Sequence, residues 1–194
     1  RLGLRSRNVP PSTTELDEAL EAASPDGVFQ RVSPELPAHI LPTGGTTGHP
    51  KAVVLTHRNL VANAWQISRW AGGRFAEDVS LACLPFFHSY GLTVCGLTGV
   101  AMGATMILHH RFRANTVLRL VERWKPTLIP AVPAMLAAFN KELRRRHYKL
   151  APVWACISGG APLNPAVAAE FSERTGAVVP CEPEIGAIEK AVFG

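Results

Sequence analysis

The chain has 194 residues, of which 47% are hydrophobic, so it is long and apolar enough to bury one substantial core. Its formal net charge of +5 permits attraction to an anionic ligand but does not indicate a nucleic-acid-binding protein. The cysteines lie far apart and without CxxC spacing, which favours reduced, buried thiols over a disulfide framework and fits the cytoplasmic location that we expect. They are Cys83, Cys95, Cys156 and Cys181.

Residues 1–37 have the composition of an edge segment followed by a linker. Pro10 and Pro11 interrupt a basic start, and Glu15 to Ala23 shows a short acidic helical pattern that stops at Ser24-Pro25-Asp26-Gly27. No residue in this part is expected to carry chemistry.

A loop rich in Gly and Thr follows, between short strands predicted at His39 to Leu41 and Ala52 to Leu55. Glycines let backbone N–H groups approach an anion, while threonine hydroxyls and a lysine add donors and charge. The loop is not a Walker A sequence, because His49 and Pro50 separate Gly48 from the lysine and a strand follows. We interpret it as a phosphate-binding loop, with an ordinary hairpin turn as the alternative. Its candidate ligand-binding residues are Thr43, Gly44, Gly45, Thr46, Thr47, Gly48 and Lys51.

Thr56 is the expected N-cap of a helix from about His57 to Trp70, which should pack on the sheet. A strand at Val79 to Leu84 then runs into Pro85-Phe-Phe-His-Ser-Tyr-Gly91. Aromatic side chains beside His88 at the end of a strand could line a ligand pocket. However, a lone histidine near aromatics is more often a packed or surface group.

The stretch from Leu92 to Leu108 contains no charged residue. At about 17 residues it is near the lower limit for a membrane span, and glycines interrupt it. We therefore predict a buried helix to about Ala101 and a strand at Thr105 to Leu108. Asn115 is the expected N-cap of the next helix, Thr116 to Trp124.

The remaining elements continue to alternate between strand and helix. The expected ranges are a strand at Thr127 to Pro130, a helix from Ala134 to about Tyr148, a strand at Val153 to Ile157 and a helix at Ala166 to Arg174 with Asn164 as its cap. This alternation predicts an α/β fold with a largely parallel sheet flanked by helices. The basic run from Lys141 to Lys149 is interpreted as a solvated helix end, since no nucleic-acid motif accompanies it.

A second glycine-rich segment, Ser158-Gly159-Gly160-Ala161-Pro162, joins the last predicted strand to its helix. Open α/β sheets bind ligands at the carboxyl ends of their strands, so this turn is a candidate binding segment, although a tight structural turn explains it equally well. The segment lacks the Gly-x-Ser-x-Gly pattern of a hydrolase nucleophile.

Two neighbouring motifs resemble the signature loop of the adenylate-forming enzymes, most closely that of fatty acyl-CoA synthetases. They are Thr43-Gly-Gly-Thr-Thr-Gly-His-Pro-Lys51 and Leu55-Thr-His-Arg-Asn-Leu60. Ala52 departs from the glycine that is usual there. The resemblance implies binding of the β- and γ-phosphates of ATP, activation of a carboxylic acid as acyl-AMP and transfer to a thiol. The implied cofactors and co-substrates are ATP, Mg²⁺ and CoA.

The resemblance also implies roles for individual residues. His88 would lie near the acyl carboxylate and the phosphate, and with Lys51 it is the candidate catalytic pair. Gly159, Gly160, Ala161 and Pro162 would lie against the adenine and acyl pocket. Residues 38–179 would be a partial AMP-binding domain, preceded by the edge segment 1–37 and followed by a divergent tail, 180–194, in which no residue can be assigned as a metal ligand.

The leading hypothesis is a fragment or truncated member of an ATP-dependent fatty acid–CoA ligase that is inactive or weakly active alone. A non-catalytic nucleotide- or acyl-binding remnant and a structural or interaction protein are the alternatives. The expected partners are small molecules rather than nucleic acid. We expect no transmembrane segment, and peripheral contact with a membrane stays open.

Overall fold

A computed structural model describes residues 16–24, 31–43, 51–150, 153 and 155–179. The chain separates into two compact units, Arg1–Val32 and Ser33–Gly194. The first contains helix α1 (Leu16–Ala22), as its acidic pattern predicts. The other elements belong to the second unit.

An antiparallel hairpin opens the second unit. Its strands are β1 (Pro37–Thr43) and β2 (Lys51–Thr56), and the register places Thr43 opposite Lys51. The hairpin leads directly into α2 (His57–Trp70), whose predicted N-cap is confirmed: Thr56 and Asn59 form a reciprocal capping box. A backbone hydrogen bond of 3.1 Å from the His57 N–H to the Leu36 carbonyl fixes the start of α2 to the base of the hairpin.

Four parallel strands form the main sheet, as the alternating pattern predicts. They are β3 (Val79–Ala82), β4 (Thr105–Leu108), β5 (Leu128–Ala131) and β6 (Ala155–Ser158), in the spatial order β4-β3-β5-β6. The chain passes from β3 to β4, which lies on one side of β3, and then crosses to β5, which lies on the other side of β3. A reversal of this kind is a topological switch point, where open α/β sheets bind ligands beyond the carboxyl ends of their strands.

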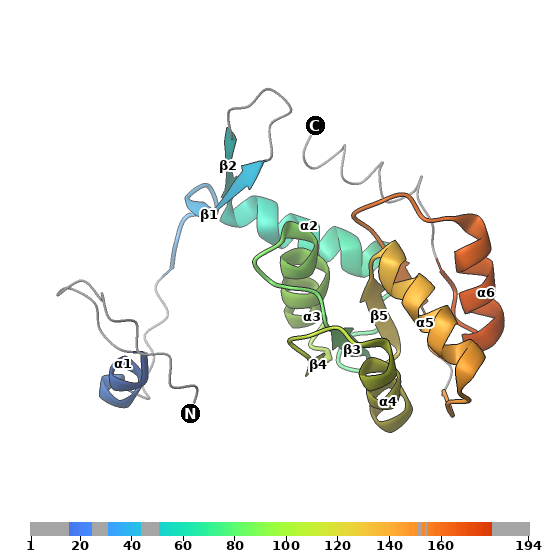
Figure 1. Cartoon of the computed structure of the whole chain (residues 1–194). Helices are drawn as coiled ribbons and strands as arrows, with labels where there is room; N and C mark the ends of the chain where they lie inside the picture. The colour runs from blue at the N-terminus through green and yellow to red at the C-terminus, as the bar shows by residue number, and fades with distance from the viewer. Residues whose placement is uncertain (1–15, 25–30, 44–50, 151–152, 154, 180–194) are drawn as a thin grey trace. The chain divides into compact units, whose positions relative to one another are not determined.

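Helices cover both faces of this sheet. The connection from β3 to β4 is the π-helical turn η1 (Gly91–Leu97) followed by α3 (Thr98–Ala101). The expectation that α2 packs on the sheet is wrong, because α2 packs mainly on η1 and α3, which lie between it and the strands. The later helices α4 (Ala114–Trp124), α5 (Pro133–Arg145) and α6 (Pro165–Thr175) pack in succession against one another. Figure 1 shows α5 and α6 on the opposite side of the sheet from α2 and α3.

Two boundaries of the later helices differ from the sequence-based expectation by more than one residue. Asn115 is not the cap of α4, because the helix already begins at Ala114 after an extended Arg113 that makes no side-chain cap. Helix α5 ends at Arg145 because the chain turns extended at Arg146 and buries Tyr148, whose hydroxyl donates a 2.8 Å hydrogen bond to Glu142. The predicted cap of α6 is confirmed, since the Asn164 side chain accepts the Ala166 N–H.

The core lies on both faces of the sheet, toward α2 and η1 on one side and toward α4 to α6 on the other. Phe139 is fully buried there, with its ring centroid 5.3 Å from that of Phe112 and 5.8 Å from that of Phe171. Cys83, Cys95 and Cys156 are buried and free, which confirms the prediction for these thiols, while Cys181 lies outside the described residues. None of the helices that the structure describes is long and apolar enough to cross a bilayer.

Candidate functional site

A cavity of about 460 Å³ lies at the carboxyl edge of the parallel sheet. The ends of β3, β4, β5 and β6, or the segments that directly follow them, all contribute to its wall, so it occupies the switch point described above. Its volume is within the range of about 300–1,000 Å³ that small-molecule sites span. The lining residues are Cys83, Leu84, Pro85, His88, Tyr90, Gly91, Phe112, Val132, Ala134, Met135 and Gly160.

The wall of this cavity is mainly apolar. His88 adds an imidazole ring, whose nitrogens can donate or accept hydrogen bonds. The His88 side chain is exposed, and its Nδ1 accepts the backbone N–H of Tyr90 at 3.3 Å. Because Nδ1 is the acceptor in this bond, the proton of the neutral ring belongs on Nε2. His88 is therefore held in the tautomer that can donate from Nε2.

Tyr90 connects the histidine segment to the second glycine-rich segment. Its side chain is buried, and its hydroxyl donates a 2.8 Å hydrogen bond to the Ile157 carbonyl on β6. A Cβ atom at Gly159 would stand only 2.9 Å from two carbons of the Tyr90 ring, so glycine is needed at this contact. Gly160 then turns the chain with φ of +80°, a conformation that favours glycine.

The π-helical turn η1 shapes the other end of the histidine segment. A Cβ at Gly91 would clash with the Pro85 carbonyl, so glycine allows the chain to fold back tightly after the aromatic motif. The Thr93 hydroxyl donates to the Ser89 carbonyl and the Thr98 hydroxyl donates to the Thr93 carbonyl, each at 2.8 Å. These bonds give donors to backbone carbonyls in and just before the π-helical turn η1. Such turns often occur at functional sites.

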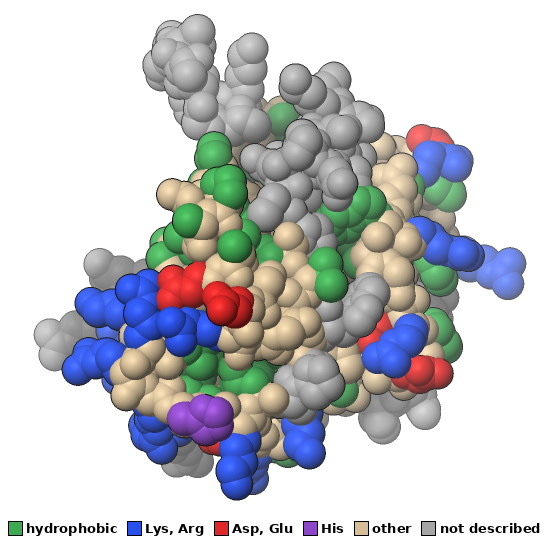
Figure 2. All heavy atoms as spheres, turned by 90° about the vertical axis from the view of Figure 1, so that its right-hand side faces the viewer, with side chains coloured by type: hydrophobic (Ala, Val, Ile, Leu, Met, Phe, Trp, Pro, Cys, Tyr) green, Lys and Arg blue, Asp and Glu red, His purple; other side chains and the backbone are tan. Residues whose placement is uncertain are grey.

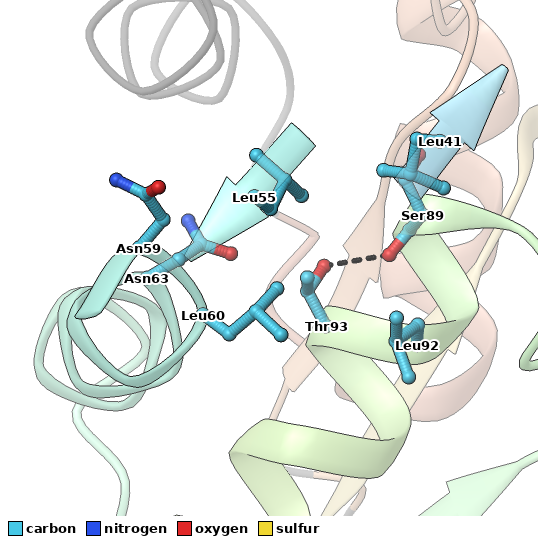
Figure 3. Close-up of a pocket in the computed structure, with 8 residues that line it drawn as sticks. All are labelled: Leu41, Leu55, Asn59, Leu60, Asn63, Ser89, Leu92 and Thr93. Atoms are coloured by element: carbon cyan, nitrogen blue, oxygen red, sulfur yellow. Dashed lines mark hydrogen bonds between the residues drawn. The ribbon is translucent and has the colours of Figure 1, made fainter. Parts of the chain in front are cut away.

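The same turn forms a wall that faces the hairpin. Between the hairpin, α2 and η1 only about 10 Å³ of space remains, which is about the room that one water molecule needs, so the hairpin base packs closely here. Figure 3 shows Leu60 of α2 directed toward Thr93 of η1, with Leu41 and Leu55 of the hairpin on the same small gap. The segment that contributes His88, Tyr90 and Gly91 to the cavity thus leads directly into a turn that packs against the hairpin.

The candidate residues named from the sequence fall into three groups: some lie outside the described residues, some lie at the cavity, and some lie away from it. Gly44, Gly45, Thr46, Thr47 and Gly48 lie outside the described residues, and of Thr43 and Lys51 only the paired backbone is described. His88 and Gly160 share the cavity wall, and Gly159 packs on Tyr90 beside it. Ala161 and Pro162 are exposed in the turn before α6 and do not line the cavity.

Tyr90 belongs to the aromatic motif around His88 that was expected to line a pocket, and it lines the cavity, whereas Phe86 and Phe87 of the same motif are exposed and do not. Sequence reasoning did not single out Phe112, Val132 or Met135 as site residues. In the sequence, Phe112, Val132 and Met135 look like ordinary core residues at a strand end or a helix start. Only the order of the strands in the sheet brings them to the same cavity.

The nucleophilic and metal-binding potential of the site is limited in the described part of the chain. Burial raises the pKa of the Cys83 thiol to about 11, so this cavity-lining group is protonated at neutral pH and is a poor nucleophile. No group of three or more His, Cys, Asp or Glu side chains that could hold a metal ion occurs among residues whose placement is described. Mg²⁺ commonly needs only one or two carboxylates together with substrate phosphates, so its involvement stays a prediction.

Comparison with known proteins gives the family. The sequence matches the AMP-binding enzyme family over residues 4–183. It is 37% identical over 149 residues to the long-chain-fatty-acid–CoA ligase of Bacillus subtilis, covering 75% of this chain and 26% of that protein. It is 34% identical over 164 residues to 4-coumarate–CoA ligase 1 of Arabidopsis thaliana, covering 83% of this chain and 28% of that protein.

A solved structure agrees with this assignment. The o-succinylbenzoate coenzyme A synthetase of Bacillus subtilis, in complex with AMP, superimposes with a TM-score of 0.71 at 30% sequence identity, covering 87% of this chain and 34% of that one. The chain thus spans about a quarter to a third of the length of the proteins that it matches. From its sequence match and its fold, the chain belongs to the AMP-binding enzyme family.

Proposed function

We propose that this chain forms part of the substrate-binding domain of an ATP-dependent acid–CoA ligase that works through an acyl-AMP intermediate. The observation that carries the proposal is the shared cavity: His88 and Gly160, which the sequence placed in two separate ligand-binding segments, line one apolar space at the switch point of the sheet. The relatives named above support the reaction class, since they are CoA ligases of fatty and aromatic acids.

The proposed reaction has two steps. A carboxylate oxygen of the acid attacks the α-phosphorus of ATP and pyrophosphate leaves; the CoA thiol then attacks the acyl carbonyl and AMP leaves. The first step moves negative charge from the carboxylate to pyrophosphate, and the second, after the thiol has lost its proton to solvent, moves it from the thiolate sulfur to the phosphate of AMP. The protein therefore contributes mainly by orienting the reactants and offsetting this negative charge. Bound Mg²⁺ would offset part of the negative charge on the phosphates.

His88 and Lys51 are the proposed catalytic side chains. The Tyr90 N–H holds Nδ1 of His88, so Nε2–H is the donor that would contact an oxygen of the acid or of the phosphate. Lys51 begins β2 at the end of the predicted phosphate loop, where a lysine would bind phosphate as a point charge. The loop from Thr43 to Gly48 would contribute backbone N–H groups.

The acid proposed for the cavity has an apolar body, as a fatty acid does. Phe112, Val132 and Met135 offer carbon surface to it, and the buried end of β3 closes one side. The glycine turn at Gly159 and Gly160, with Ala161 and Pro162 beyond it, is proposed to face the adenine. A cytoplasmic location belongs to the same proposal, because CoA ligases act on soluble ATP and CoA.

Calorimetric titration with ATP tests the nucleotide part of this proposal. Lys51→Ala should weaken ATP binding about tenfold or more, in the range of a lost charge-assisted contact to phosphate. Lys141→Ala, which removes an equal charge from an exposed position on α5, is the matched control and should bind like the wild type. Equal affinities for all three proteins would contradict the role of Lys51, and no binding by any would favour a structural or interaction protein.

An activity assay separates the fragment from a complete enzyme. We expect the 194-residue chain alone to show little or no acid-dependent pyrophosphate release or acyl-CoA formation, because it spans only about a quarter of its curated relatives. Turnover at ordinary enzymatic rates would contradict this expectation. Binding of ATP and of an acyl-AMP analogue without any turnover is equally expected of a non-catalytic remnant.

A further inference from the structure

The amino edge of the main sheet, opposite the cavity, carries an unusual combination of exposed side chains. The strands are parallel, so the segments that precede them meet at this edge. Backbone hydrogen bonds join these segments: the Ala76 N–H donates to the Met102 carbonyl at 2.8 Å, and the Thr127 N–H donates to the Val79 carbonyl at 2.8 Å. We call the following exposed residues the amino-edge surface: Phe75, Val100, Arg119, Arg123, Trp124, Lys125, Arg145, Arg146 and Lys149.

Three large apolar side chains of this surface are open to solvent. Phe75 and Val100 are each 70% exposed and Trp124 is 53% exposed. They precede three different strands, β3, β4 and β5, and Phe75 lies over the turn at Gly103 that follows Val100. Single exposed hydrophobic residues are ordinary on a protein surface, but three at the tips of neighbouring connections form a feature that needs a partner.

Cationic side chains of α4 and the end of α5 lie at the same edge, where these helices lead into β5 and β6. The guanidinium of Arg123 lies 5.2 Å from the Trp124 ring, and that of Arg146 lies 5.4 Å from the Tyr148 ring. Arg119 is also close enough to Tyr148 to act on the pKa of its hydroxyl, so α4 and the end of α5 present their charges together. Figure 2 shows Lys and Arg side chains at the bottom of the face that carries α5 and α6, with hydrophobic side chains exposed between them, as well as further Lys and Arg beside Asp or Glu at its sides.

The carboxylates of this edge are fewer than the cations of the amino-edge surface, none of which forms an ion pair among the described residues. Glu122 accepts the Lys149 backbone N–H and Glu142 accepts the Tyr148 hydroxyl, while Asp78 and Glu77 pair with Arg74. Helix dipoles favour Lys and Arg in a last turn, but Arg119 stands in the middle of α4 and Lys149 beyond α5.

We propose that the amino-edge surface docks on an anionic lipid bilayer, with Phe75, Val100 and Trp124 at the interface and the cations on phospholipid headgroups. Tryptophan favours the water–membrane boundary, and Lys or Arg near an anionic bilayer adds electrostatic attraction. A nucleic acid fits less well, because a binding surface for it uses aromatic rings as stacking platforms, whereas Val100 offers only an aliphatic tip. Docking in this way leaves the cavity at the edge of the sheet that faces away from the bilayer.

Vesicle co-sedimentation tests this proposal. The chain should bind phosphatidylcholine vesicles that contain phosphatidylglycerol and should bind pure phosphatidylcholine much more weakly. Raised salt should remove most of the binding and leave a smaller part that depends on the apolar side chains. Each cation near the bilayer strengthens binding roughly fivefold, so Arg119→Gln/Arg123→Gln should bind roughly 25-fold more weakly. Arg111→Gln/Arg113→Gln removes the same charge from the segment after β4, at the opposite edge, and should bind like the wild type.

Two further variants separate specific docking from nonspecific effects. Arg119→Lys/Arg123→Lys keeps the charge and should keep binding, which checks that the loss in the glutamine variant is not a loss of folding. Phe75→Ser/Trp124→Ser should reduce the binding that remains at high salt. Equal binding to neutral vesicles, an equal loss in both glutamine variants, or binding to duplex DNA without binding to vesicles would each overturn the proposal.

Discussion

The hydroxyl of Tyr90 donates a 2.8 Å hydrogen bond to the carbonyl of Ile157, a residue 67 positions later in the chain. The bond joins the segment that carries His88 to the strand that delivers Gly159 and Gly160. Since the Tyr90 N–H also binds Nδ1 of His88, one residue fixes two walls of the cavity. We therefore regard Tyr90 as a positioning residue for the candidate site.

Tyr90→Phe should lower stability and ligand affinity together. Removing the hydroxyl leaves the buried Ile157 carbonyl without its donor, which costs about 1–3 kcal/mol of unfolding free energy. Urea unfolding measures that loss, and calorimetry with an acyl-AMP analogue measures the affinity. Tyr148→Phe removes the bond to Glu142 at the other edge of the sheet and should lower stability without changing the affinity. A Tyr90→Phe protein with unchanged affinity would contradict the positioning role.

Gly159→Ala should be more harmful than Gly176→Ala, although of the two only Gly176 has a left-handed backbone. The new Cβ would press on the Tyr90 ring, and overpacking of this kind costs about 1–3 kcal/mol and should shift Tyr90 away from His88. Gly176 has φ of +72° with open space around its Cβ position, so Gly176→Ala should cost only about 1 kcal/mol of backbone strain and leave ligand binding intact. Thermal unfolding of both variants, with ligand titration, checks the order; a smaller effect at Gly159 would be inconsistent with the tight contact.

Asp78 should make the stability of the fold depend on acid pH. Burial by itself raises the pKa of its carboxyl, but hydrogen bonds from the Arg74 N–H at 2.6 Å and the Thr127 hydroxyl at 2.8 Å, together with the Arg74 guanidinium, hold the pKa below its ordinary value of 3.8. A carboxyl with a lowered folded-state pKa stabilises the fold above its unfolded pKa and loses that contribution as pH falls through the folded pKa.

The comparison of the wild type with Asp78→Asn measures this contribution. At neutral pH the variant should be less stable by about 1–3 kcal/mol, and the difference should shrink below pH 3.8. Glu77→Gln, which removes an exposed partner 3.7 Å from Arg74, is the control and should change little at any pH. A pH-independent difference for Asp78→Asn would exclude the charged carboxylate as the stabilising form.

Cys83 should react slowly with alkylating reagents despite lining the cavity. Raising its pKa from 9.0 to about 11 lowers the thiolate fraction at pH 8 roughly a hundredfold. Cys95, with a pKa of about 12 and no exposure, should react more slowly still, and denaturant should accelerate both. Peptide mapping after iodoacetamide treatment reads out each site; alkylation of native Cys83 at the rate of a free thiol would contradict its burial.

Local signals predicted much of the fold. Thr56 gave the start of α2 because a threonine cap is a property of a few neighbouring residues, and the uncharged stretch after His88 gave β4 at its observed bounds. The boundaries that failed depend on distant contacts. Tyr148 ends α5 because its ring is drawn into the core, and α4 begins at Ala114 without the side-chain cap that Asn115 was expected to provide.

The candidate site was predictable only in part, for a related reason. His88 and Gly160 stand in short motifs whose chemistry is visible in the sequence. Their meeting in one cavity follows from the strand order β4-β3-β5-β6, which no local pattern encodes. The Tyr90 hydroxyl finds its acceptor on another strand, so its role became apparent only from the folded chain.

The most direct test of the account is whether a ligand of the AMP-binding family occupies the cavity. Ala134 lines the cavity from the first turn of α5, while Ala137 is exposed on the same helix and does not line it. Calorimetric titration with a nonhydrolysable acyl-AMP analogue should show binding by the wild type and by Ala137→Trp, and a loss of about a hundredfold or more for Ala134→Trp, whose indole would fill the cavity. Equal affinity of the two tryptophan variants would contradict the assignment of the cavity as the ligand site.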